Sequence, residues 1–300
     1  MEKFKHILVA IDFKTETEQA KIDRALLMAK LYPTRITLFS CVEKVTIDPE
    51  TSVISSEEKQ RILLARTENR LQHLIHFFKE KGVENVTYRV KLGDPATEII
   101  LQVLRDQHDL LMVSTKASKT LKEHLLGGTT LHLMRKCPCP IWAVKPKAKK
   151  CAKIMVAVHF GDDPKQDNHA LNRDLLQVGG MMASLRNSEL HVINTVPKIK
   201  TSQNPQKALA LRGQKIKELV KVANLKVSAI PHVVEGDVTT VLPEQVAQQS
   251  VDLLVMGMLS RTGILGFFIG NTAEKILSKV NSSVLTVKPK EFVSPIKLEN

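Results

Sequence analysis

Short apolar runs alternate with longer amphipathic segments along the first half of the chain. Residues 6–11 form an almost continuous apolar run, which is expected of a strand covered on both faces of a sheet. Similar runs predict strands at 36–42, 110–113 and 141–144, and an alternation of apolar and polar residues predicts another at 86–92. Each of the first four predicted strands is followed by a segment with a helical period, so strands and helices are expected to alternate.

The segments between the strands predict helices over 17–32, 55–81, 95–104 and 129–136. Ser55 and Glu58 have the spacing of a capping box at the start of the second helix, and Gly82 suits its end. Pro95 suits the first turn of the third. A regular alternation of strand and helix predicts an α/β fold with a parallel, doubly wound sheet.

The second half of the chain repeats the first. Residues 109–114, DLLMVS, recur 143 positions later as 252–257, DLLVMG, and Gly93–Asp94 recurs at the same offset as Gly236–Asp237. We therefore predict a second set of strands at 154–158, 190–196, 228–234, 253–256 and 284–287, with helices at 168–184, 206–223, 243–249 and 272–280.

The repeat predicts two domains of one fold. We assign residues 1–147 to the first domain (copy one), 151–290 to the second (copy two) and 291–300 to a tail. The short segment 146–151 is polar and basic, as expected of a linker. The tail, from Lys290 onwards, is expected to be loosely held.

Composition narrows the range of partners. A formal net charge of +13 favours anionic ligands, although solubility alone would also account for it. One Trp and two Tyr supply few aromatic faces for single-stranded nucleic acid, so no specific nucleic-acid partner is expected. The most apolar stretch, 251–270, is interrupted by Asp252 and Arg261, so no membrane span is expected.

The cysteine content indicates a reducing compartment. The four cysteines have no spacing that requires disulfides, and the first residues have no signal-peptide pattern, so we expect a cytoplasmic protein. Cys137 and Cys139 flank Pro138. We expect the two thiols to pack at a helix–strand junction, with a metal or redox role as the alternative.

A candidate ligand site follows from the sheet. Open parallel sheets bind ligands at the carboxyl ends of the strands, where the winding direction reverses. In copy two the fourth strand ends at Gly257, and Gly270-Asn271-Thr272 opens the next helix. A small residue at a strand end and the free N–H groups of a helix N-terminus can together hold a phosphate. Ordinary turn and capping chemistry is the alternative.

These features resemble the universal stress protein family, in particular its tandem members of the E type, over almost the whole of both copies. The resemblance implies a Rossmann-like stress-response protein, with a role in resistance to DNA damage, that binds ATP or another adenine nucleotide without a catalytic role. It also implies that 141–144 pairs with 284–287 across a two-fold axis, giving an intramolecular pseudo-dimer, with a homodimer also possible.

The family motif is an aspartate at the end of the first strand, then Gly-x-x-Gly, nine residues and Gly-Ser/Thr after the fourth. Copy one keeps the aspartate and copy two keeps the first and last glycines. At the aspartate position copy two has a histidine, which cannot act as an anionic acceptor. The ligand-binding residues that the resemblance implies are Asp12, Ser114, Lys116, Gly127 and Gly128 in copy one, and His159, Gly257, Met258, Ser260, Arg261, Gly270, Asn271 and Thr272 in copy two.

Other functions remain open at this point. Asp12 could simply cap the loop into the first helix. The loop 263–269 is unusually apolar, so copy two could instead carry an apolar or amphiphilic ligand with Arg261 at its anionic head group. A slow nucleotide hydrolase would need a metal or a base near the phosphates. The chain has no P-loop, His-Glu-x-x-His or Gly-x-Ser-x-Gly motif, so no catalytic or metal-binding residue is predicted.

Overall fold

The computed structural model describes residues 4–13, 18–45, 55–115, 126–145, 151–161, 169–197, 205–258 and 270–298. Of the expected linker, only Cys151 is among them. The elements of copy one are β1 (His6–Ala10), α1 (Gln19–Leu31), β2 (Arg35–Val42), α2 (Ser56–Glu80), β3 (Val86–Leu92), α3 (Pro95–Asp106), β4 (Leu110–Ser114), α4 (Gly128–Lys136) and β5 (Ile141–Val144).

Copy two repeats this order, as predicted. Its elements are β6 (Lys153–Ala157), α5 (His169–Ser184), β7 (Glu189–Val196), α6 (Pro205–Ala223), β8 (Ala229–Glu235), α7 (Val238–Gln248), β9 (Leu253–Gly257), α8 (Asn271–Leu277) and β10 (Ser283–Val287). None of the helices in the described part of the chain combines the length and the apolar character needed to cross a membrane.

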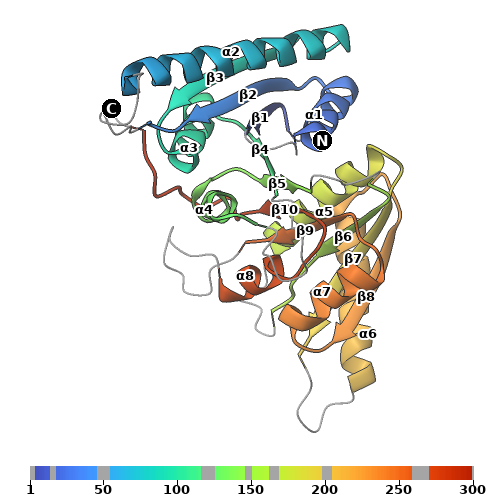
Figure 1. The fold of residues 1–300 in the computed structure, drawn as a ribbon. Coiled ribbons are helices and arrows are strands. Elements are labelled where there is room, and N and C mark those ends of the chain that lie inside the picture. The colour runs from blue at the N-terminus through green and yellow to red at the C-terminus, as the bar shows by residue number, and fades with distance from the viewer. Residues whose placement is uncertain are drawn as a thin grey trace.

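The described strands form one ten-stranded sheet in the order β3-β2-β1-β4-β5-β10-β9-β6-β7-β8 (Figure 1). All neighbouring strands are parallel except β5 and β10, which pair antiparallel. The doubly wound fold predicted for each copy is confirmed, and the two sheets are joined edge to edge.

The β5–β10 pairing, here called the seam, is where the two copies meet. The predicted pairing of the two fifth strands is confirmed, and each strand covers the other's otherwise open edge. The register across the seam is Val284 with Ala143, Leu285 with Trp142, and Thr286 with Ile141.

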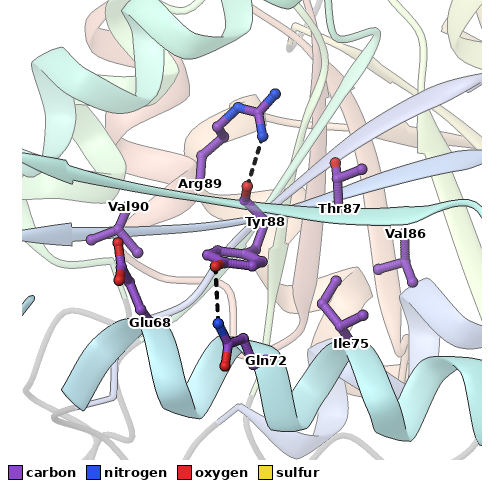
Figure 2. A pocket seen from close by; sticks show the side chains of 8 residues that line it. All are labelled: Glu68, Gln72, Ile75, Val86, Thr87, Tyr88, Arg89 and Val90. Carbon is purple, nitrogen blue, oxygen red and sulfur yellow. Dashed lines mark hydrogen bonds between the residues drawn. The ribbon is translucent and has the colours of Figure 1, made fainter. Parts of the chain in front are cut away.

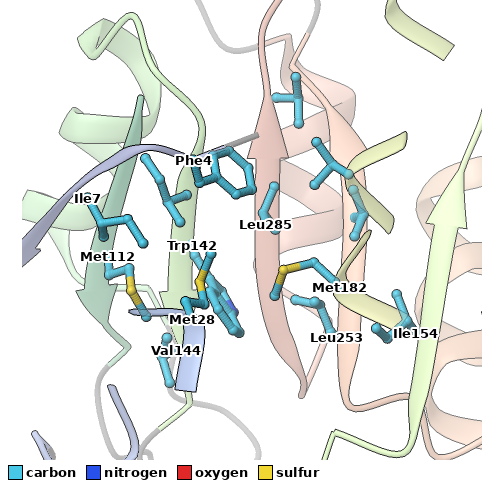
Figure 3. Close-up of a cluster of buried hydrophobic side chains, with 14 of the residues drawn as sticks. Phe4, Ile7, Met28, Met112, Trp142, Val144, Ile154, Met182, Leu253 and Leu285 are labelled. Atoms are coloured by element: carbon cyan, nitrogen blue, oxygen red, sulfur yellow. The ribbon is translucent and has the colours of Figure 1, made fainter. Parts of the chain in front are cut away.

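The core is continuous across the seam. Successive strand residues point to opposite faces of the sheet. Helices α1, α2, α5 and α6 cover one face, and α3, α4, α7 and α8 cover the other. On the first face, Trp142 is 3% exposed and lies near Met28 and Leu285 (Figure 3). Because each apolar cluster contains residues of both copies, the copies are expected to unfold together.

One helix is longer than predicted. The sequence prediction starts the helix at Pro243, whereas α7 begins at Val238 and contains Pro243. The helix starts earlier because the Asp237 carboxylate accepts a hydrogen bond from the N–H of Thr239, at 2.9 Å, and so caps it. Proline inside the helix removes one backbone donor, which the packed helix tolerates.

The expectation of a loosely held tail is wrong for part of it. The tail runs past α4 towards α3 of copy one (Figure 1). Ser294 is buried, and Ile296 packs against the cluster beneath α3, α4, α7 and α8. Apolar contact with this cluster, which contains residues of both copies, holds Ile296, and the spacing of the tail residues gave no periodic signal of it.

Two histidines in contact at the amino ends of β1 and β4 make the stability of the protein depend on pH. His108 is 4% exposed, and its ring centre lies 3.9 Å from that of His6. Burial and the charge of His6 lower the pKa of His108 from 6.5 to about 4. The unfolded chain therefore binds a proton near 6.5 that the folded protein binds only near 4, so stability falls as the pH drops through this range.

We expect the free energy of unfolding to fall by roughly 2 kcal/mol between about pH 7 and pH 5 from this group. Urea titrations at the two pH values would measure it. His108→Gln cannot be protonated there, so this variant should lose that part of the dependence. An equal dependence in the variant would assign the effect to other groups.

Candidate functional site

The sheet reverses its winding between β1 and β4 in copy one, and between β6 and β9 in copy two. At such a point the connections leave in opposite directions and open a crevice at the carboxyl ends of the strands. Each copy therefore has one such switch point, here called its crevice, and the residues predicted for the site lie around these two places.

The crevice of copy one contains a buried ion pair that the sequence gave no sign of. Lys21 of α1 is 1% exposed, and its Nζ lies 2.7 Å from Oε2 of Glu18. The same Nζ donates a hydrogen bond to the carbonyl oxygen of Ala10 at the end of β1. Ser114, at the end of β4, donates from Oγ to Oε1 of Glu18 at 3.1 Å. The hydroxyl predicted to meet a ligand is thus bound to the protein itself.

Asp12 belongs to the same electrostatic group. Burial lowers the pKa of Lys21, whereas the negative charges of Glu18 and Asp12 raise it. Asp12 itself is exposed at the mouth of the crevice. The aspartate that matches the family motif therefore helps to compensate an ammonium group of its own chain.

The two glycines of copy one lie at a helix N-terminus. Gly127 precedes α4, and Gly128 is its first residue. A Cβ on Gly128 would have no described atom within 4 Å, so open space rather than crowding surrounds this position. Lys116 lies outside the described residues.

In copy two, hydrogen bonds from neutral asparagine side chains take the place of the ion pair. His159 takes the place of Asp12 and is exposed. Asn172 of α5 is buried; its Oδ1 accepts from the N–H of His159 at 3.1 Å, and its Nδ2 donates to the carbonyl oxygen of His159 at 2.7 Å. Asn194 of β7 donates to the carbonyl oxygen of Val158 at 3.0 Å. Arg212 of α6 donates to the carbonyl oxygen of Phe160 at 2.7 Å. Residues 158 and 159 are thus held by neutral amides, and the loop is anchored further on by an arginine.

Packing accounts for two of the predicted residues of copy two. A Cβ on Gly257 would lie 2.9 Å from Cδ2 of Leu171 in α5, so a larger residue here would require the end of that leucine side chain to move. Met258 is buried in the core and donates its N–H to the carbonyl oxygen of Val287 at 2.9 Å. A role in ligand binding stays a prediction for both.

The turn Gly270-Asn271-Thr272 forms the start of α8, with Gly270 as its N-cap. Asn271 is exposed and Thr272 is half-buried. The first N–H groups of a helix have no intrahelical acceptor and carry a partial positive charge. Ser260, Arg261 and the apolar loop 263–269 lie outside the described residues.

A hollow of about 620 Å³ lies away from both crevices, at the edge of the sheet between α2 and β3 (Figure 2). Tyr88 points towards α2, and its hydroxyl accepts a hydrogen bond from Nε2 of Gln72 at 3.2 Å. Two of the polar side chains that line the hollow are thus bound to each other, and the hollow lies away from the strand ends, so we keep the crevices as the candidate site. Among the described residues, no three His, Cys, Asp or Glu side chains are grouped so as to hold a metal ion.

Comparison with known proteins relates both copies to one family. The model of the universal stress protein family matches residues 3–145 and 152–288. The chain is 28% identical over 314 residues to universal stress protein E of Photorhabdus laumondii, covering 99% of each chain. It is 25% identical over 317 residues to universal stress protein E of Escherichia coli K12, covering 100% of this chain and 99% of the other.

A solved structure has the same fold. The crystal structure of a putative universal stress protein from Pseudomonas aeruginosa UCBPP-PA14 superimposes with a TM-score of 0.73 at 22% identity, covering 96% of this chain and 94% of that one.

Proposed function

This chain belongs to the universal stress protein family, and on that basis we propose that it is a stress-response protein that binds an adenine nucleotide in the crevice of copy two. The contrast between the two crevices carries this proposal. In copy one, Lys21, Glu18 and Ser114 bind one another at the strand ends. In copy two, the corresponding place has the neutral Asn172, whose side chain forms hydrogen bonds with the backbone of His159.

The start of α8 is suited to the phosphates. The N–H groups of Asn271 and Thr272 are at the first turn of the helix, where free donors and the helix dipole favour an anion. The exposed His159 at the end of β6 would lie beside the ribose or the base. Because it is no carboxylate, recognition of the sugar hydroxyls is expected to be weaker than in relatives with the family aspartate.

Binding without turnover is the expected activity. Hydrolysis would require a metal or a base beside the phosphates, and no such group is assigned in either crevice. The four cysteines are free thiols, which supports a cytoplasmic location. Protection against DNA damage would then follow from nucleotide sensing rather than from repair chemistry.

We expect Thr272→Glu to weaken ATP binding at least roughly tenfold, because a carboxylate at the start of α8 repels the phosphates. The variant should fold, since acidic residues suit a helix N-terminus. Thr272→Gln is the control of equal size without the charge and should bind nearly as the native protein does. Titration calorimetry with ATP would measure all three proteins.

Asp12→Ala distinguishes the two crevices. Its affinity should be unchanged if copy two holds the nucleotide. Loss of binding in Asp12→Ala together with native affinity in Thr272→Glu would move the site to copy one. If ATP does not bind at all, native mass spectrometry of the gently purified protein would reveal whether an apolar or amphiphilic ligand is carried instead.

A further inference from the structure

Two buried thiols lie side by side next to the seam. Cys137 follows α4, and Cys139 lies two residues before β5. Cys137 is fully buried and Cys139 is 8% exposed. Their Sγ atoms are 3.5 Å apart, within hydrogen-bonding distance for sulfur. The pair is thus held close enough for one thiol to react at the sulfur of the other.

A lysine of copy two completes the cluster. Lys288, which follows β10, is 9% exposed and reaches across the seam. Its Nζ donates to the carbonyl oxygens of Arg135 at 3.1 Å and of Cys137 at 2.5 Å. The ring centre of Phe292, in the tail, lies 3.8 Å from this Nζ. Carbonyl groups and a ring solvate the ammonium group but do not neutralise it.

The thiols are the groups that can neutralise it. Burial lowers the pKa of Lys288 to about 8, and the negative charge available on Cys137 and Cys139 raises it. Burial raises the pKa of the Cys137 thiol, but the hydrogen bond from Cys139 and the charge of Lys288 outweigh this and lower it. The pKa of Cys139 lies well above its usual value because of Cys137 and burial. Cys137 is therefore the nucleophile, and Cys139 a neighbouring neutral thiol.

This arrangement is specific to one side of the seam. Lys145 is the counterpart of Lys288 at the 143-residue offset and likewise reaches across, with Nζ 2.7 Å from Oδ1 of Asn281. At the positions that correspond to Cys137 and Cys139, copy two has Val280 and Ser282. The dithiol is thus no general requirement for packing a lysine at this seam.

We propose that Cys137 and Cys139 are a site of reversible oxidation to an internal disulfide, with hydrogen peroxide as the oxidant. The Cys137 thiolate attacks one peroxide oxygen: an S–O bond forms, the O–O bond breaks, and the departing hydroxide is protonated to water. The Cys139 sulfur then attacks the sulfenic acid: an S–S bond forms, the S–O bond breaks, and the Cys139 proton leaves with the second water. Two electrons pass from the two sulfurs to one peroxide.

The burial of the two thiols limits the size of the oxidant that can reach them. The S–S distance must shorten from 3.5 Å to about 2 Å, which two residues separated only by Pro138 can achieve by a local turn. Hydrogen peroxide is close to water in size and can reach a covered site. A bulky disulfide such as oxidised glutathione has to present its sulfur in line with the attacking thiolate, which the burial of both thiols prevents.

The other two cysteines are internal controls. Burial raises the pKa of Cys41 to about 12 and that of Cys151 to about 11, although both are more exposed than the pair. Exposure alone would oxidise Cys41 and Cys151 first. The proposed chemistry oxidises Cys137 and Cys139 first.

The experiment treats the reduced full-length protein with hydrogen peroxide, unfolds it in an alkylating reagent and maps its peptides by mass spectrometry. The peptide with Cys137 and Cys139 should lose two hydrogens and escape alkylation, while Cys41 and Cys151 are alkylated; dithiothreitol should reverse the change. An alkylated pair at peroxide doses that modify Cys41 or Cys151 would overturn the proposal. In a parallel sample treated with oxidised glutathione in place of peroxide, an adduct on Cys137 of the folded protein would overturn the selection by size.

Three variants separate the roles. Cys139→Ser should leave a sulfenic acid on Cys137 that dimedone traps once the protein is unfolded, whereas Cys137→Ser should leave Cys139 unmodified. Lys288→Met should slow oxidation at least roughly tenfold, and Lys288→Arg, which keeps the charge, should recover most of the rate. Circular dichroism checks the fold of each variant. Equal rates for Lys288→Met and the native protein would rule out activation by the lysine.

Discussion

Replacement of Trp142 by alanine should destabilise the protein by about 3–5 kcal/mol. Trp142 lies in the middle of β5 opposite Leu285 of β10, in the apolar cluster that runs through both copies (Figure 3). Truncation leaves a cavity at the seam, where the paired strands cannot move together to fill it. Urea unfolding followed by circular dichroism would measure the loss, because the only tryptophan of the chain is removed with the change.

Trp142→Phe is the matched control. The indole N–H of Trp142 has no hydrogen-bond partner among the described residues. Phenylalanine keeps most of the ring and removes this unsatisfied donor, so its smaller loss of packing is partly offset. Both proteins should unfold in a single transition. Two transitions, with only one of them shifted in Trp142→Ala, would contradict a core shared by the two copies.

The second large effect is expected at the crevice of copy one. Glu18→Ala should destabilise the protein by about 3–5 kcal/mol, because it removes the carboxylate that lies 2.7 Å from the buried ammonium of Lys21. Asp12 and the carbonyl oxygen of Ala10 remain, but the nearest counter-charge is lost. Urea unfolding at neutral pH measures this change.

Removing both charges should cost far less. In Lys21→Met with Glu18→Gln, no buried charge is left unpaired, and the apolar methionine replaces a side chain of similar length. We expect the double variant to be within about 1 kcal/mol of the native protein, or more stable. A double variant as unstable as Glu18→Ala would mean that the loss comes from packing or from the Ser114 hydrogen bond rather than from the buried charge.

The strands could be predicted because the exposure of each strand leaves a direct record in the sequence, as an apolar run in the buried β5 and as an alternation of apolar and polar residues in the edge strand β3. The runs 86–92 and 141–144 coincide with β3 and β5 residue for residue. The capping box was also predictable, and Ser55 accepts a hydrogen bond from the N–H of Glu58 at 3.1 Å. For α7 the proline signal was misleading, whereas the repeat of Asp94 as Asp237 marked the true start.

The crevices could not be predicted to the same depth. The motif comparison identifies positions at strand ends. Whether Ser114 meets a ligand, however, depends on the side chain of Glu18, which is the N-cap residue of α1 and is almost a hundred residues away in sequence. A lysine on a helix usually faces solvent, and nothing in the residues around Lys21 indicates that it is buried. Gly257 shows another limit, since a glycine that packs against a neighbouring helix and a glycine that approaches a phosphate look the same in one sequence.

The seam also bears on how the two halves were able to diverge. In a dimer of identical subunits every substitution occurs twice, once on each side of the axis. Here Arg135 donates from Nε to Oε1 of Glu274 at 2.9 Å, while the symmetry-related positions hold Leu131 and Ser278, which cannot form an ion pair. Because a short tether keeps the partner at an effective concentration on the order of millimolar, such one-sided contacts suffice. Each half was thereby free to lose residues of the family motif that the other half retained.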